Sequence, residues 1–105
     1  MPKILTTTIL FLFLVIVAKT SVGQDSQIKI TGTVKDELRL PLPGVNVTNL
    51  MTKITVITDN EGKFNVMANR GDSIRVSYIG YTDHLTKIDN IIDLNITLNA
   101  SSNSL

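Results

Sequence analysis

The chain of 105 residues has no cysteine, no tryptophan and a single histidine, His84. Without cysteine it can form neither a disulfide nor a thiolate nucleophile, and one histidine is too few for a zinc site. Its formal net charge is +1 and its ten basic residues are dispersed, so the basic surface typical of nucleic-acid-binding proteins is missing. We therefore expect no nucleic acid, no metal and no cofactor as ligand.

Catalytic groups are equally scarce. With one histidine, a nucleophilic arrangement would have to combine a serine or threonine with His84 and an aspartate such as Asp83 or Asp89. Neighbouring residues of a strand point to opposite faces, so Asp83 and His84 would not meet on one face. The sequence predicts no catalytic residue, and we expect the chain not to be an enzyme.

A long apolar run occurs only near the N-terminus. Residues 9–18, ILFLFLVIVA, follow Lys3 and precede the small residues Ser21 and Gly23, which is the layout of a secretory signal peptide. The run is shorter than the roughly 20 residues that a membrane-spanning helix needs. We expect residues 1–23 to be a cleaved signal peptide and 24–27 a short linker, with a retained N-terminal anchor as the alternative.

From Ile28 onward apolar and polar residues alternate with a period of two, and no window has the spacing of an amphipathic helix. Segments of this kind cover residues 28–34, 44–50, 54–58, 62–68, 72–80, 81–88 and 92–98. Turn-forming residues separate them. Seven short strands with this spacing predict an all-β chain that folds as a small antiparallel β-sandwich.

The segment TDNEGKF, residues 58–64, predicts a turn that closes a hairpin. Gly62 occupies the position where a left-handed residue would end a type I turn. Its acidic residues suggest a calcium loop, but that loop needs oxygen ligands at alternate positions, whereas Asp59, Asn60 and Glu61 are consecutive. The pattern therefore favours a turn over a metal site.

Two tyrosines flank Gly80 in the segment RVSYIGYTD. Tyr78 continues the inward stripe of the preceding strand, which predicts a ring at the rim of the core. Gly80 breaks the alternation, as at a bulge or tight bend, and Tyr81 would cover that bend. The alternative is that Tyr78, Tyr81 and His84 form a stacking surface for sugars or peptides, which would require a bulge at Gly80.

Five motifs in one order, ITGTVKD, PLPGVNV, TDNEGKFNV, GDSIRVSYIGY and NITL, resemble the carboxypeptidase-like regulatory domain. This is a transthyretin-like or prealbumin-like β-sandwich, and the resemblance is to the version at the N-terminus of SusC/RagA-type TonB-dependent receptors of Bacteroidetes. It covers residues 28–98, which we expect to form the domain. The residues of the structural motif are Gly32, Pro43, Gly44, Asp59, Gly62, Phe64, Gly71, Tyr78, Gly80 and Tyr81.

The chain departs from the family pattern at two places. The segment NLMTKIT has no glycine where the family has a glycine-containing turn, so this hairpin is the least regular part of the predicted fold. After Leu98 only seven residues follow, which we expect to be a disordered tail over 99–105. The plug and transport parts of the receptors would not fit there, so the sequence predicts that this chain is not itself a transporter.

The resemblance implies a non-catalytic module, exported to the periplasm or the outer membrane, that acts through protein contacts and is accessory to TonB-dependent nutrient uptake. Its expected partner is an envelope protein such as a TonB-dependent receptor, and after signal cleavage it would not span the membrane. The alternatives are a small carbohydrate- or peptide-binding module and a truncated receptor fragment. The segment DSI also resembles a bacterial O-glycosylation sequence, with Ser73 as its acceptor.

Overall fold

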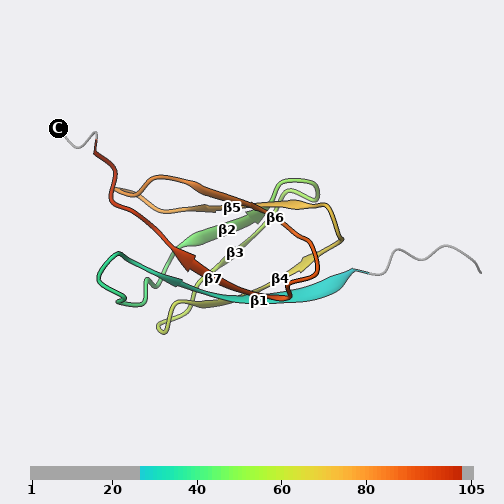
Figure 1. The fold of residues 1–105 in the computed structure, drawn as a ribbon, viewed down its shortest axis with the longest axis horizontal. Helices are drawn as coiled ribbons and strands as arrows, with labels where there is room; N and C mark the ends of the chain where they lie inside the picture. Colours follow the sequence, from blue (N-terminus) through green and yellow to red (C-terminus); the bar gives the residue numbers. More distant parts are fainter. Residues whose placement is uncertain (1–26, 103–105) are drawn as a thin grey trace, which may run out of the picture.

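The structure is a computed structural model that describes residues 27–102. Seven strands are present in this part of the chain: β1 (Ile28–Lys35), β2 (Asn46–Asn49), β3 (Ile54–Ile57), β4 (Lys63–Ala68), β5 (Ser73–Ser77), β6 (His84–Lys87) and β7 (Asp93–Thr97). They form two sheets, in the orders β4-β1-β7 and β3-β2-β5-β6, which face each other (Figure 1). The predicted seven-stranded β-sandwich is confirmed, while the predicted signal peptide lies outside the described residues.

One strand pair differs from the antiparallel arrangement that the sequence predicts. β7 runs parallel to β1, with Gly32 opposite Leu94 and Val34 opposite Ile96. The other pairs are antiparallel. The reason is that β6 belongs to the other sheet, so the chain crosses between sheets before β7 and enters β7 from the end at which β1 begins. Such a crossover does not force an antiparallel pairing.

The core lies between the two sheets and follows the period-two alternation. On β4, for example, Phe64, Val66 and Ala68 are buried while the intervening side chains are exposed. The residues that form the buried core are Ile30, Val34, Leu42, Val45, Val47, Phe64, Val66, Ala68, Ile74, Val76, Ile88, Ile96 and Leu98. Alternation therefore decides which face is apolar on β1, β2, β4, β5 and β7. It does not do so on β3 and β6, where Ile54, Ile57 and Leu85 remain exposed.

A close approach of two elements fixes the centre of the three-stranded sheet. Gly32 on β1 lies opposite Phe64 on β4 and Leu94 on β7. A Cβ atom at Gly32 would lie 2.3 Å from Cζ of Phe64 and 2.9 Å from the carbonyl oxygen of Leu94. The ring of Phe64 thus occupies the space that any other residue at position 32 would need.

The hairpin between β2 and β3 forms without glycine. The Asn49 carbonyl accepts a hydrogen bond from the Lys53 N–H at 2.8 Å, and the Asn49 side-chain oxygen accepts one from the Met51 N–H at 2.9 Å. Lys53 adopts the left-handed conformation, with φ of 65°, which glycine adopts more readily than other residues. The asparagine side chain thus supplies the turn contacts of this irregular hairpin.

The Asp59–Lys63 turn joins two strands that lie in different sheets. Gly62 has φ of 74°, and the Gly62 N–H donates to the Asp59 carbonyl at 2.9 Å. The turn forms, but the ladder expected of a hairpin does not, because β3 pairs with β2 whereas β4 pairs with β1. The chain therefore changes sheet at this turn, and Phe64 at the start of β4 packs over Gly32.

The residues after β7 connect the two sheets. The Thr82 N–H donates to the Asn99 carbonyl at 2.9 Å, and the Ser101 N–H donates to the Gly80 carbonyl at 2.8 Å. An isolated bridge joins Tyr81 and Ala100. The expectation of a disordered tail from residue 99 is therefore wrong for residues 99–101, whose backbone groups form hydrogen bonds with Glu37, with Gly80 in the Tyr78–Tyr81 turn and with Thr82 directly after it.

Candidate functional site

The Tyr78–Tyr81 turn lies at the end of the sandwich at which β5 ends. The Tyr81 N–H donates to the Tyr78 carbonyl at 3.1 Å, and Gly80 has φ of 87°, which fits a type II turn with glycine at its third position. The two rings contact each other with centroids 5.8 Å apart, and both pack against the edge of the core. Of the bulge and the tight bend that the sequence allowed at Gly80, the structure has the tight bend, and this turn brings the two tyrosines together.

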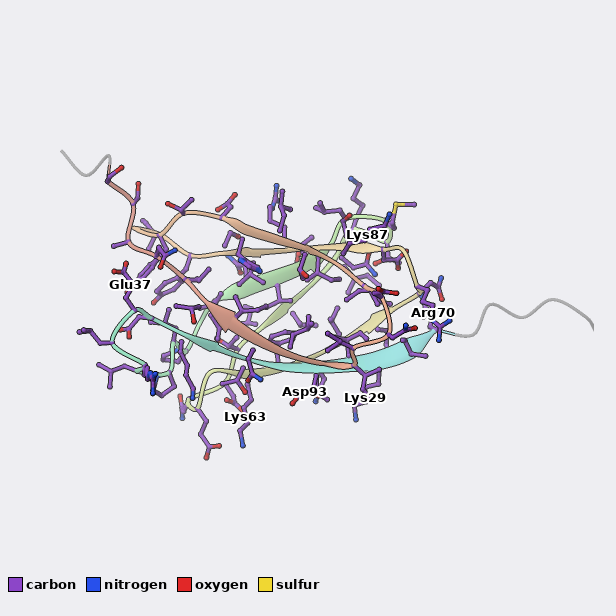
Figure 2. The ribbon with its side chains drawn as sticks, viewed as in Figure 1. Lys29, Glu37, Lys63, Arg70, Lys87 and Asp93 are labelled. Atoms are coloured by element: carbon purple, nitrogen blue, oxygen red, sulfur yellow. The ribbon has the colours of Figure 1, made fainter. Side chains whose placement is uncertain are left out.

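Tyr81 also lines a surface hollow of about 310 Å³. The other lining residues are Asp36, Glu37, Leu38 and Ala100. Glu37 lies at this end of the sandwich (Figure 2) and its Oε1 accepts a hydrogen bond from the Ala100 N–H at 2.6 Å. An aromatic ring beside two carboxylates can contact a sugar or a basic peptide side chain, so this hollow is the first candidate site.

A second hollow of about 380 Å³ lies at the opposite end of the sandwich. It is lined by Arg70, Gly71, Lys87, Ile88 and Asp89. Arg70 and Lys87 lie near the end at which β1 begins, far from Glu37 (Figure 2). Charges of opposite sign therefore line the two hollows, although Asp89 partly offsets the two cations of the second.

His84, the one histidine, is not among the residues that line either hollow. It begins β6, opposite Val76 of β5, and is partly buried. Asp83 precedes the strand and is exposed. No group of three or more histidine, cysteine, aspartate or glutamate residues within 27–102 is placed to hold a metal ion. Of Tyr78, Tyr81 and His84, only Tyr81 lines one of these two hollows.

A buried polar pair was missed by the sequence analysis. Asn49 is fully buried and its Nδ2 donates to Oδ2 of Asp72 at 3.0 Å and to the Met67 carbonyl at 3.1 Å. The same Asp72 oxygen accepts the Asn69 N–H at 2.9 Å. Asn49 thus connects the β2–β3 hairpin, the edge of β4 and the β4–β5 turn. The only sequence signal was an asparagine where the alternation predicts an apolar side chain.

The contacts of Asp72 also bear on the DSI segment. Asp72 is buried and its carboxylate accepts hydrogen bonds, so Asp72 has a structural role of its own. Ser73 begins β5, lies opposite Lys87 and is partly buried. Glycosylation of Ser73 remains a prediction, and part of the pattern that suggested it is explained by the fold.

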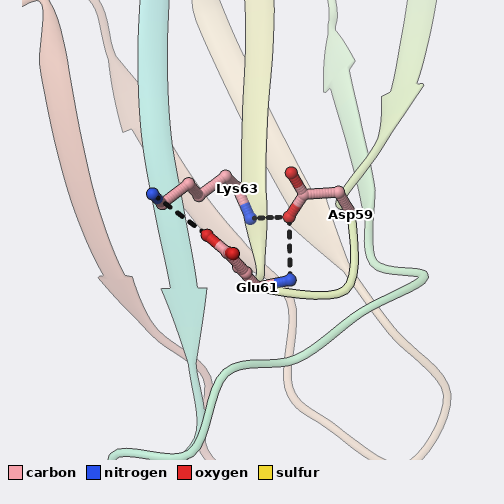
Figure 3. A network of polar contacts seen from close by, with 3 residues as sticks. All are labelled: Asp59, Glu61 and Lys63. Atoms are coloured by element: carbon pink, nitrogen blue, oxygen red, sulfur yellow. Dashed lines mark hydrogen bonds and ion pairs between the residues drawn. The ribbon is translucent and has the colours of Figure 1, made fainter.

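Asp59 anchors the turn between β3 and β4 (Figure 3). Its Oδ1 accepts hydrogen bonds from the Lys63 and Glu61 N–H groups, both at 2.9 Å, while the Lys63 ammonium group pairs with the Glu61 carboxylate at 3.1 Å. The hydrogen bond from Lys63, then the one from Glu61, holds the pKa of Asp59 below its ordinary value of 3.8. These contacts fix the turn.

The remaining motif residues lie in turns around the sandwich. Gly44 and Gly71 have positive φ, 78° and 90°, and Pro43 is exposed just before Gly44. A Cβ atom at Gly44 would lie in ordinary contact with the Tyr78 ring, at 3.8 Å, whereas the space around Gly71 is open. Nothing in the structure brings these residues together into one site, and their functional role stays a prediction.

Two facing sheets whose strands are joined by short turns place the chain among small β-sandwich domains. The family described as the CarboxypepD_reg-like domain matches residues 30–105, and the chain belongs to this family. The resemblance seen in the sequence motifs is therefore confirmed over nearly all of the described residues.

Two similar proteins are TonB-dependent receptors. The chain is 37% identical over 82 residues to the TonB-dependent receptor P39 of Formosa agariphila, a match that covers 77% of this chain and 8% of the receptor. It is 46% identical over 55 residues to the TonB-dependent receptor SusC of Bacteroides thetaiotaomicron, covering 52% of this chain and 6% of the receptor. The chain thus spans less than a tenth of either relative and is related to one of their domains.

The part of the chain that the structure describes, residues 27–102, includes no helix with the length and apolar character required to cross a membrane.

Proposed function

We propose that this chain is a non-enzymatic β-sandwich module that acts through protein contacts in the bacterial cell envelope, beside a TonB-dependent receptor. The observation that carries the proposal is the match of residues 30–105 to a regulatory-domain family, together with two TonB-dependent receptors that are similar to 82 and 55 residues of the chain. In those relatives the matched part is a small share of a much longer receptor, as expected of an accessory module.

The exposed apolar side chains support a contact role. Leu38 and Ile79 are 79% and 91% exposed, and both belong to loops at the end of the sandwich that carries the Tyr81 hollow. Contiguous exposed apolar surface is typical of protein interaction sites. Leu38 lines the same hollow as Tyr81, and Ile79 precedes Tyr81 by two residues in the same turn. We expect this end of the module to contact the receptor or a protein bound to it.

The proposal is tested by cross-linking in cells. The full chain, tagged and expressed in a bacterium that contains SusC-type receptors, should cross-link to a TonB-dependent receptor identified by mass spectrometry. Leu38→Asp or Ile79→Asp should reduce the yield of the cross-linked receptor. Ile91→Asp, which changes an exposed isoleucine near the opposite end of the sandwich, should leave that yield unchanged. Recovery of no receptor from a correctly folded chain would contradict the proposal.

A second candidate is a small binding module for sugars or peptides. It rests on the hollow in which Tyr81 lies beside Asp36 and Glu37. Titration of the isotope-labelled chain with neutral oligosaccharides and with lysine-containing peptides, followed by NMR, separates this candidate from the first. Saturable shifts confined to Tyr81 and its neighbours, lost in Tyr81→Ala, would favour the binding module.

A further inference from the structure

Strand β3 is an edge strand without a charged residue. Its sequence is Ile54-Thr55-Val56-Ile57, and the side chains of Ile54 and Ile57 are 58% and 63% exposed. Natural edge strands are usually protected from pairing by lysine, proline, a bulge or a covering segment. β3 consists of β-branched residues, which favour strand pairing. Its sequence thus lacks the usual protection.

The other edges of the two sheets are less open. On β4, the Lys63 N–H donates to the Asp59 side chain, the Lys63 carbonyl accepts the Asp59 N–H, and the Met67 carbonyl accepts the Asn49 amide. These contacts occupy much of the β4 edge. β6 carries Lys87 and β7 carries Asp93, charges that oppose the pairing of either strand with a copy of itself.

The backbone groups of β3 that face outward can be identified. The Thr58 N–H donates to the Val45 carbonyl at 3.0 Å, and in an antiparallel ladder bonded and non-bonded pairs alternate. The N–H and C=O groups of Thr55 and Ile57 therefore point away from β2. β4, which contacts both β2 and β3, belongs to the facing sheet, and among the described residues no strand pairs with the outer edge of β3.

We propose that β3 pairs with β3 of a second copy of this chain, antiparallel and about a two-fold axis at Val56. In this register Thr55 lies opposite Ile57 of the second copy, and all the outward-facing backbone groups of both residues are used. A shift by one bonded pair in either direction would need the N–H of Lys53 or of Asp59. Both are already donated within the chain, to Asn49 and to Lys63.

The charges that flank β3 fit the same register. Lys53 precedes the strand and Asp59 follows Thr58, so the antiparallel pair brings Lys53 of each copy toward Asp59 of the other. The ion pair found between described residues is Lys63–Glu61. Asp59 uses its Oδ1 for two backbone hydrogen bonds within its own turn, so its Oδ2 is the oxygen that would face Lys53 of the second copy. The surface is therefore complementary to itself, as an interface about a two-fold axis must be.

Disulfide trapping tests the position of the axis, because the chain has no cysteine of its own. At a non-bonded antiparallel pair the Cα atoms lie about 4.5 Å apart, close enough for a disulfide. The full chain carrying Val56→Cys should therefore form a covalent dimer on mild oxidation. The matched control is His84→Cys. Val56 and His84 are the first and last residues of one cross-strand row, at opposite edges of the four-stranded sheet, and both are partly buried.

Sedimentation equilibrium of the full chain tests the association itself. Ile57→Lys should weaken the dimer by about tenfold or more, because a lysine replaces an apolar contact at the pairing edge. Leu85→Lys is the control, since Leu85 on β6 is 63% exposed, as is Ile57. Circular dichroism verifies that each variant is folded.

The outcomes separate clearly. A wild-type dimer that Ile57→Lys dissociates and Leu85→Lys does not, together with selective trapping at Val56, supports the pairing. A wild-type chain that stays monomeric at every concentration overturns it, as does equal trapping at positions 56 and 84. A monomer whose cross-linking to a receptor is lost in Ile57→Lys would assign the edge to the receptor instead. The pairing does not depend on receptor association, so either proposal can fail alone.

Discussion

Arg39 and Gly62 hold equivalent positions in two turns with the same hydrogen bonds. In each turn an aspartate, Asp36 or Asp59, accepts two backbone N–H groups on Oδ1 and a third on its carbonyl. The third donor is the Arg39 N–H in one turn and the Gly62 N–H in the other, and φ is 65° and 74°. The same turn thus holds arginine at one end of β1 and glycine before β4.

This equivalence predicts opposite effects of two substitutions. Arg39→Gly should raise the free energy of unfolding by up to about 1 kcal/mol, because the left-handed conformation costs a side chain about that much. Gly62→Arg should lower it by about 3 kcal/mol or more, because a Cβ atom there would also lie 2.5 Å from the Val34 carbonyl oxygen. Chemical denaturation measures both, and equal effects would contradict the steric explanation.

Gly32→Ala should destabilise the fold by about 1–3 kcal/mol, since its methyl group would overlap the Phe64 ring. The added variant Phe64→Leu removes that overlap. We therefore expect the double variant Gly32→Ala/Phe64→Leu to lose less stability than the sum of the two single variants. A double-mutant cycle by urea denaturation provides the check, and strict additivity would show that the clash is absorbed elsewhere.

Asn49→Asp should place two carboxylates together in the core. The new oxygen would face Oδ2 of Asp72, from which Nδ2 of Asn49 now lies 3.0 Å away. We expect a loss of about 2–4 kcal/mol at neutral pH, because the hydrogen bond is replaced by repulsion. In the folded variant the carboxyl pKa would be raised, so stability should recover as the pH falls. Unfolding measured across acidic pH tests this, with Asn46→Asp on the exposed face as the control.

The pH dependence of the Asp59 turn has the opposite sign. Hydrogen bonds in the folded state hold the pKa of Asp59 below its ordinary value of 3.8. The stabilising contribution of the carboxylate is therefore complete above that ordinary value and is lost as the pH falls through the folded-state pKa. NMR titration of the Asp59 carboxyl should give a midpoint below 3.8. Asp59→Asn, which keeps the oxygen acceptor, should remove this part of the acid sensitivity.

The alternation of side chains predicted the strands well because burial on one face leaves a local signal. The stripe from Ile28 to Val34 faces the core, as its sequence indicates. The stripe predicted from Ile92 to Leu98 does so from Leu94 onward, whereas Ile92 lies before β7 and is exposed. Pairing is not local. β3 and β4 belong to different sheets because Phe64 of β4 packs against Gly32 of β1, and β7 runs parallel to β1 because the chain crosses between the sheets before it. Neither relation leaves a pattern within a single segment of the sequence.

The candidate site was only partly predictable for a related reason. Gly80 marked a break between the two tyrosines, but the hollow also needs Glu37 and Ala100, which are distant in sequence and joined by a hydrogen bond. Lys53 and Arg39 adopt a conformation that sequence normally assigns to glycine. Asn49 had no charge or motif to mark its role. Tertiary contacts decide all these cases.

The parallel pairing of the first and last strands determines how the module would respond to tension. The described chain enters at one end of the sandwich and leaves at the other (Figure 1). A pull on both ends runs along β1 and β7, so it loads the hydrogen bonds of their ladder together in shear instead of opening them one at a time. Forced unfolding depends on the unfolding barrier. The short pairing of residues 99–101 with the Tyr78–Tyr81 turn should yield first, and the β1–β7 ladder should then bear the load.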